Sequence, residues 1–203
     1  MTVISQRTFR PLPGKTAVLR ERVHRLAEIM TRCGARTRIA HVAWGDGARD
    51  IHLYGVFDTV EAGAAMAAKM AADPVATALQ AEVEKEPASV WEGPHVWRVA
   101  YGATKPDFPV ILQREYEVDR RHLRSALALM PDVQALMPDV PMLAIVPVIA
   151  GDMGRLMIGY YAQSLVEMGK RIDQIGASEA FQSILVRAAE HGRLITSRVI
   201  VNA

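Results

Sequence analysis

Residues 42–63 read VAWGDGARDIHLYGVFDTVEAG, and residues 148–169 read VIAGDMGRLMIGYYAQSLVEMG. Aligned at an offset of 106 residues, the two stretches share Gly-Asp, an arginine, a tyrosine, Val-Glu and a glycine. The same offset places Leu79 on Leu185, so one alignment without a gap spans a hairpin, a strand and a helix. Repetition over this length predicts that the two halves of the chain adopt the same fold.

Composition and charge limit the classes of protein to consider. Of the 203 residues, 50% are hydrophobic and 23% are charged, as in globular proteins that bury a sizeable core. The net charge of +2 gives no broad basic surface, so no nucleic-acid partner is expected. The single cysteine, Cys33, excludes an internal disulfide and a thiolate metal cluster. The N-terminus lacks an apolar signal core and no apolar run reaches ~20 residues, which predicts a cytoplasmic protein without a membrane partner.

Hydrophobic periodicity divides the first half into strand, helix, strand, strand, helix and strand. The predicted strands are Val3–Phe9, Arg38–Trp44, Asp50–Phe57 and a stretch within Val90–Tyr101. The first helix has an apolar stripe at spacings of three and four, namely Leu19, Val23, Leu26, Met30 and Cys33. Gly45-Asp46-Gly47 is typical of a hairpin turn. Asp58 is expected to cap the helix Val60–Ala71, and Asp73-Pro74 to begin a second helical piece that ends near Glu86.

The second half repeats this order, with predicted strands Val110–Glu117, Met142–Ile149, Arg155–Tyr161 and Ile195–Val201. A helix from about Asp119 is interrupted by Pro131, and Ser164 takes the place of Asp58 as a helix cap. Residues 1–103 and 110–203 are therefore interpreted as two ferredoxin-like βαββαβ repeats joined by a linker at 104–109. Helices cover one face of each sheet, so we expect an α+β fold whose two sheets pack together as an intrachain α+β barrel.

This order of elements resembles the dimeric α+β barrel superfamily, with the two subunits of the usual dimer fused into one chain. The pattern Val60…Gly63…Met66…Asp73-Pro74…Leu79 adds to the resemblance. Members include antibiotic-biosynthesis mono-oxygenases, NIPSNAP-type proteins, muconolactone isomerases and haem-handling chlorite dismutases. The resemblance implies a small-molecule-binding barrel and a mono-oxygenase-like oxidoreductase that needs no cofactor and acts on an aromatic or polyketide-like substrate. A non-catalytic binding or scaffold protein and a haem- or metal-binding barrel are the alternatives.

The first-half hairpin carries the candidate catalytic residues. A turn centred on Asp46-Gly47 pairs His41 with His52 and places both on one face of the sheet, beside Tyr54. Two imidazoles and a phenol on one face suit proton transfer or the binding of a metal ion. The alternative is that the histidines hydrogen-bond within the barrel interface or reach solvent at its rim.

The second half lacks these histidines. At the offset of 106 it has Pro147, Ile158 and Tyr160. A duplicated fold in which one copy keeps a site and the other fills it would show this asymmetry. We therefore expect His41, His52 and Tyr54 to border a concavity that is present in the first half alone.

Three further residues are candidates for substrate binding. Arg7 and Arg114 lie in the first strand of each half and could bind a carboxylate with two hydrogen bonds. Alternatively, they pair with local acids such as Glu115 and Glu117. Trp44, with Trp91 and Trp97, could line a flat aromatic pocket, or all three could pack in the core. The alanine-rich stretch Ala62–Ala72 offers a flat surface for a homodimer.

Overall fold

The structure is a computed structural model, and it describes residues 2–203. The strands are β1 (Val3–Pro11), β2 (Arg36–Gly45), β3 (Ile51–Phe57), β4 (Ser89–Gly102), β5 (Val110–Val118), β6 (Met142–Ile149), β7 (Arg155–Ala162) and β8 (Gly192–Asn202). The helices are α1 (Thr16–Arg32), α2 (Val60–Ala71), α3 (Pro74–Lys85), α4 (Leu123–Ala128), α5 (Met130–Leu136), α6 (Leu165–Gly176) and α7 (Glu179–Ala189). Residues 103–109 connect β4 to β5.

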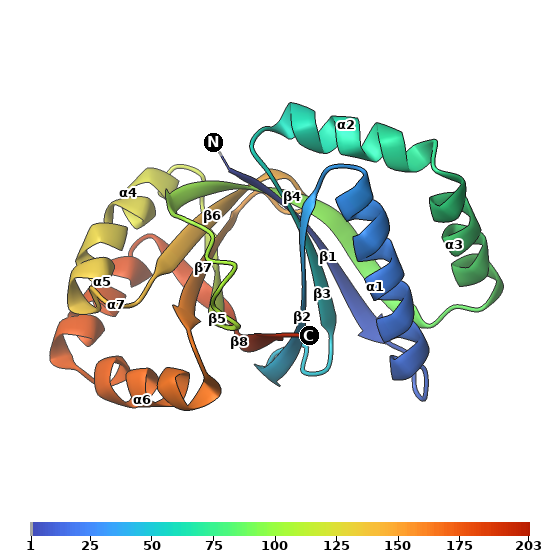
Figure 1. Cartoon of the computed structure of the whole chain (residues 1–203). Coiled ribbons are helices and arrows are strands. Elements are labelled where there is room, and N and C mark those ends of the chain that lie inside the picture. The colour runs from blue at the N-terminus through green and yellow to red at the C-terminus, as the bar shows by residue number, and fades with distance from the viewer. Residues whose placement is uncertain (1) are drawn as a thin grey trace.

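The strands close into one barrel in the order β1-β3-β2-β8-β5-β7-β6-β4. The two halves meet where β2 pairs with β8 and where β4 pairs with β6, both antiparallel. Helices α1–α3 cover one side of the barrel and α4–α7 cover the opposite side (Figure 1). The predicted α+β architecture, two ferredoxin-like repeats in an intrachain barrel, is confirmed.

Three apolar cores follow from this arrangement. One lies between the first-half sheet and its helices, around Leu19, Val23, Met30, Leu53 and Leu79. A second lies between the second-half sheet and its helices, around Leu112, Met130, Ile158, Tyr160 and Phe181. The third fills the barrel interior, around Ile4, Val42, Trp97, Ile111, Ile145 and Ile200. Side chains alternate along each strand, so each strand supplies the barrel interior with one face and a helical core with the other.

Local capping signals are mostly as expected. The Asp73 carboxylate accepts from the amides of Val75 and Ala76 and starts α3. Ser164 starts α6 in the same manner, by accepting from an amide three residues later. The prediction for Asp58 was wrong, because Thr59 is the N-cap of α2. The Asp58 carboxylate instead forms an exposed ion pair with Arg36 at 3.0 Å.

A single offset of 106 residues does not describe the repeat in three dimensions. The pairing of β1 with β3 sets Thr8 opposite His52, and the pairing of β5 with β7 sets Glu115 opposite Met157. The barrel-facing counterpart of His52 is therefore Met157, one residue before the Ile158 that the sequence alignment indicated. Because neighbouring residues of a strand lie on opposite faces, this shift of one residue exchanges the barrel interior for the helical core.

No helix within residues 2–203 is long and apolar enough to cross a membrane.

Candidate functional site

The hairpin of β2 and β3 does not bring His41 and His52 together. Ala40 lies opposite His52, and His41 lies opposite Ile51. His41 therefore faces the helical side of the sheet, whereas His52 faces the barrel interior. The predicted grouping of His41 with His52 and Tyr54 on one face was wrong.

The physical reason is the shape of the connection between the two strands. The Val42 amide donates to the Asp50 carbonyl, and the Val42 carbonyl accepts from the Arg49 amide, so Val42 faces the two residues that precede β3. Arg49 adopts a left-handed conformation with φ of 82°. This bulged loop replaces the tight turn expected at Asp46-Gly47 and changes the register by one residue.

His52 and Tyr54 form a pair in the barrel interior. The His52 Nδ1 lies 2.8 Å from the Tyr54 hydroxyl, and the His52 side chain is 0% exposed. Burial, aided by the positive charge of Arg198, lowers the pKa of His52 to about 3. Burial also raises the pKa of Tyr54 to about 12. Both side chains are therefore neutral at physiological pH, and His52 is a weak base.

Arg7 lies on the outer face of β1, beside a cavity of about 450 Å³ between the first-half sheet and helices α1 and α3. The lining is largely apolar and includes Phe9, Leu19, Leu26, Met70, Leu79 and Trp91. Within residues 2–203 the Arg7 guanidinium forms no ion pair: it contacts only the Ser5 Oγ at 3.4 Å and the Met30 Sδ at 3.7 Å. Burial lowers the pKa of Arg7, as desolvation of a charge without a counter-ion requires.

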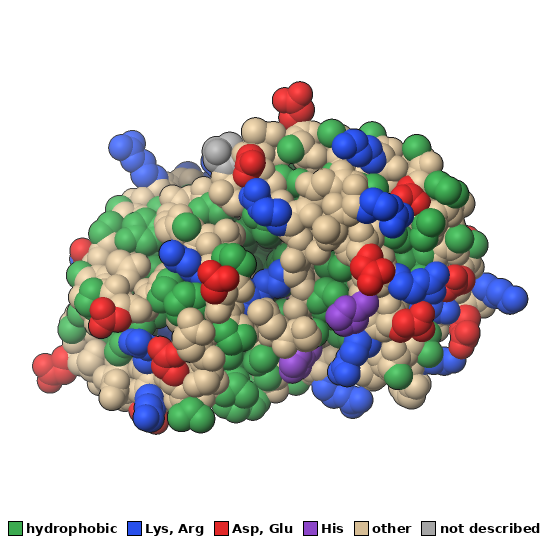
Figure 2. Space-filling model, viewed as in Figure 1, with side chains coloured by type: hydrophobic (Ala, Val, Ile, Leu, Met, Phe, Trp, Pro, Cys, Tyr) green, Lys and Arg blue, Asp and Glu red, His purple; other side chains and the backbone are tan. Residues whose placement is uncertain are grey.

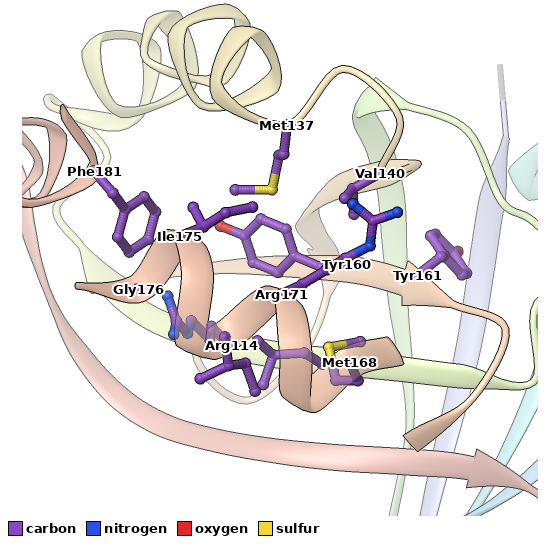
Figure 3. A pocket seen from close by; sticks show the side chains of 12 residues that line it. Arg114, Met137, Val140, Tyr160, Tyr161, Met168, Arg171, Ile175, Gly176 and Phe181 are labelled. Atoms are coloured by element: carbon purple, nitrogen blue, oxygen red, sulfur yellow. The ribbon is translucent and has the colours of Figure 1, made fainter. Parts of the chain in front are cut away.

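Arg114 is the counterpart of Arg7, but its surroundings are filled. The guanidinium lies over the rings of Tyr160 and Phe181, 5.9 Å and 5.7 Å from their centroids. In Figure 3 the Tyr160 ring occupies the centre of this site, with Met137 and Ile175 around it. Only about 40 Å³ remains empty. Arg114 therefore has aromatic partners where Arg7 has open space.

Two small residues explain the difference between the halves. Gly55 pairs with Ser5 in β1, and Tyr160 occupies the corresponding place opposite Leu112 in β5. In the helices, Ala76 is the third residue after the N-cap Asp73, and Phe181 is the third after the N-cap Ser178. The first half thus has a glycine and an alanine at the two positions whose aromatic rings cover Arg114 in the second half.

The alternative expectation, that Arg7 and Arg114 pair with Glu115 or Glu117, was wrong. Glu115 pairs with Arg155 and Arg198, and Glu117 pairs with Arg193. Neither arginine of the first strands has a carboxylate partner among the residues that the structure describes.

The three tryptophans do not form one pocket. Trp44 is 52% exposed near the end of β2 and lines none of the cavities described for this chain. Trp97 is 4% exposed in the barrel interior. Trp91 alone lies at the cavity beside Arg7, where its side chain is 53% exposed. Of the three predicted substrate-binding residues Arg7, Trp44 and Arg114, only Arg7 lines the large first-half cavity.

The other polar groups at this cavity already have partners. The Arg22 guanidinium donates to the Glu86 carbonyl at 2.5 Å. The Gln80 amide donates to the exposed Glu84 carboxylate at 2.9 Å. The lining therefore supplies one free positive charge in an apolar setting, and it lacks a buried proton acceptor. Such a site can bind an anionic group and stabilise negative charge that develops on a bound molecule.

No protein-family model and no curated protein sequence matches this chain. Solved structures do match it over nearly its whole length. A crystallised anthrone oxidase-like protein shares 14% identity, with 100% of this chain and 91% of the other covered and a TM-score of 0.69. A candidate monooxygenase from Lactobacillus acidophilus NCFM shares 9% identity, with 99% and 93% covered and a TM-score of 0.62. A chlorite dismutase variant from Candidatus Nitrospira defluvii shares 10% identity, with 100% and 90% covered and a TM-score of 0.58.

This chain has the dimeric α+β barrel fold. Both halves of the barrel come from one polypeptide, as the repeat in the sequence predicted. At these levels of identity the likeness concerns the fold alone. Activity has to be argued from the residues of the cavities.

Haem, which the resemblance to this barrel superfamily also implies, does not fit the cavities between sheet and helices. A haem iron needs a histidine, cysteine or tyrosine ligand, or a methionine paired with histidine. The cavity beside Arg7 is lined by none of the first three. Tyr160 lines the second-half site, but the space there is too small for a porphyrin. In the described part of the chain, no group of three His, Cys, Asp or Glu side chains could hold a metal ion.

Proposed function

We propose that this α+β barrel protein binds a flat, mostly apolar molecule with an acidic oxygen in the first-half cavity, and that it oxidises this molecule as a monooxygenase-like enzyme. The observation that supports this proposal is Arg7, a partly buried guanidinium without a counter-ion at a cavity of about 450 Å³. This volume lies within the range of small-molecule sites. A carboxylate, phenolate or enolate would give Arg7 the charge-assisted hydrogen bonds that the protein itself does not supply.

The chemistry that this cavity supports is stabilisation of an anion. A positive charge in an apolar cavity lowers the pKa of a bound phenol or enol, because it favours the ionised form. For a substrate with an activated CH2 group, oxidation by O2 to a ketone and one water balances without any other reductant. The substrate then supplies all four electrons, and Arg7 stabilises the carbanion or enolate that meets oxygen.

The second candidate is a binding protein without turnover. It is favoured by the lining itself, because the only carboxylate at the cavity, Glu84, is exposed and held by Gln80. The two functions share the binding step and differ in oxygen consumption.

The test uses anthrone as a probe with both properties, a flat apolar ring system and an acidic CH2 group that is conjugated with a carbonyl through the aromatic rings. Binding is followed by quenching of tryptophan fluorescence, to which Trp91 at the cavity contributes, and turnover is followed with an oxygen electrode against the rate without protein. The decisive variant is Ala76→Phe, which copies Phe181 of the second half and closes the space over Arg7. The matched variant Ala81→Phe changes an exposed position of the same helix.

We expect the wild type and the Ala81→Phe variant to bind anthrone and to accelerate oxygen uptake, and the Ala76→Phe variant to do neither. Saturable anthrone binding with no oxygen uptake above background would favour the second candidate, a binding protein without turnover. Equal binding by the Ala76→Phe variant would show that this cavity is not the site.

A further inference from the structure

A separate cavity of about 150 Å³ lies inside the barrel, between the two halves. Its walls are apolar and come from both repeats, namely Ile4, Val56, Ile111, Leu143, Ile145 and Ile200. Tyr54 and Met157 also line it. The sheet separates this cavity from the one beside Arg7, because residues of opposite parity face the two spaces. The hollow at the centre of the face in Figure 2 lies beside Lys or Arg side chains.

Arg38 is the charged group of this cavity. Its guanidinium donates to the carbonyls of Phe108 at 3.0 Å and of Lys105 at 3.4 Å. Its Nε is buried without a hydrogen-bond partner. It forms no ion pair within the described residues, and burial lowers the pKa of Arg38. The charge is thus desolvated and only partly satisfied, at the edge of an apolar space.

Other charges at the mouth favour an anion as well. Lys105 and Arg36 lie on the lining, and no carboxylate does. Arg36 is neutralised by Asp58 outside the cavity, so the excess positive charge comes from Arg38 and Lys105. Deeper inside, the buried Gln113 Oε1 lacks a donor. An apolar cavity with a cationic mouth selects a molecule with an apolar body and one negative end.

We propose that the barrel interior is a second ligand site, which takes a small aromatic carboxylate with its carboxylate on Arg38 and its ring among the isoleucines. An apolar cavity of this volume holds about one benzene ring. The ring would fill the space between Ile111, Ile145 and Ile200, while the carboxylate stays at the mouth. This site is independent of the function proposed for the first-half cavity.

The probes are benzoate and benzyl alcohol, which have the same ring and differ in charge. Isothermal titration of the full chain measures both affinities at low and high salt. Arg38→Gln removes the charge, and Arg10→Gln removes an equal charge at the opposite end of the barrel, where Arg10 is exposed beside Asp50. We expect Arg38→Gln to weaken benzoate binding at least about tenfold and to leave benzyl alcohol within about threefold. Arg10→Gln should change neither affinity.

A second variant keeps the test decisive if Arg38→Gln fails to fold. Gly159 lies on the cavity wall, and a Cβ there would meet only the Ile111 Cγ2 methyl group, at 3.2 Å. Gly159→Leu should therefore fill the cavity and abolish binding of both probes. The Arg7→Met variant, which alters the first-half cavity, should bind both probes as the wild type does.

Three results would overturn the proposal. These are no saturable benzoate binding by the wild type up to about 10 mM, unchanged binding by a folded Arg38→Gln or Gly159→Leu variant, and loss of benzoate with Arg7→Met. The last would place benzoate in the first-half cavity.

Discussion

Replacing Arg7 with methionine is expected to stabilise the ligand-free protein, although the side chain is partly buried. The native contacts to the Ser5 Oγ and the Met30 Sδ are long, so their loss costs less than about 1 kcal/mol. Methionine keeps most of the apolar volume and removes a desolvated, unpaired charge. We expect a net gain of about 1 kcal/mol, which raises the Tm by about 2–4 °C for a chain of this length.

Arg114→Met is the matched control at the equivalent place of the second half. Its guanidinium lies over the Tyr160 and Phe181 rings, and each such contact contributes about 0.5–2 kcal/mol. Loss of both should lower the free energy of unfolding by about 1–4 kcal/mol. The same substitution at two equivalent positions should thus change the free energy of unfolding in opposite directions.

Chemical denaturation at pH 7 without ligand measures both effects, with the slope against denaturant as a check that the unfolded states are comparable. A ligand at 100 times its Kd should then stabilise the wild type by about 2.7 kcal/mol and leave the Arg7→Met variant unchanged. If Arg7→Met lowers the free energy of unfolding as much as Arg114→Met does, Arg7 is a structural residue and the binding argument fails.

His52→Met, which copies Met157, should flatten the pH dependence of stability. The pKa of His52 is about 3 in the folded state and 6.5 in the unfolded state, so this histidine's contribution to wild-type stability is full above pH 6.5 and falls by about 1.4 kcal/mol per pH unit towards pH 3. Urea denaturation at several pH values measures this, and an equal pH dependence of the free energy of unfolding in both proteins would contradict it. Ser164→Ala removes the N-cap of α6 and should cost about 1 kcal/mol by thermal denaturation, a loss that Ser164→Asp should largely avoid. Phe181→Ala should cost about 3–5 kcal/mol and open a cavity over Arg114 that a crystal structure would reveal; a collapsed site with a smaller loss would argue against the filled second copy.

The sequence by itself determined the order and type of the elements. The apolar stripe of α1, the Asp73-Pro74 start of α3 and the alternation along β3 are local patterns, and local hydrogen bonding and burial enforce them. The internal repeat added the architecture, because two half-covered sheets in one chain bury each other. The fold was therefore predictable without any structure.

The position of the site was decided by tertiary structure. The bulge at Val42 shifted the hairpin register by one residue and moved His41 to the other face of the sheet, and a turn of unknown shape leaves this choice open in the sequence. A comparison of the helix caps could have singled out Ala76 against Phe181, which differ in size at one place in the two copies. That this difference leaves Arg7 without a partner depends on packing between β1, β3 and α3, which are far apart in the chain. Packing of this kind is set by three-dimensional contacts, and no local pattern encodes it.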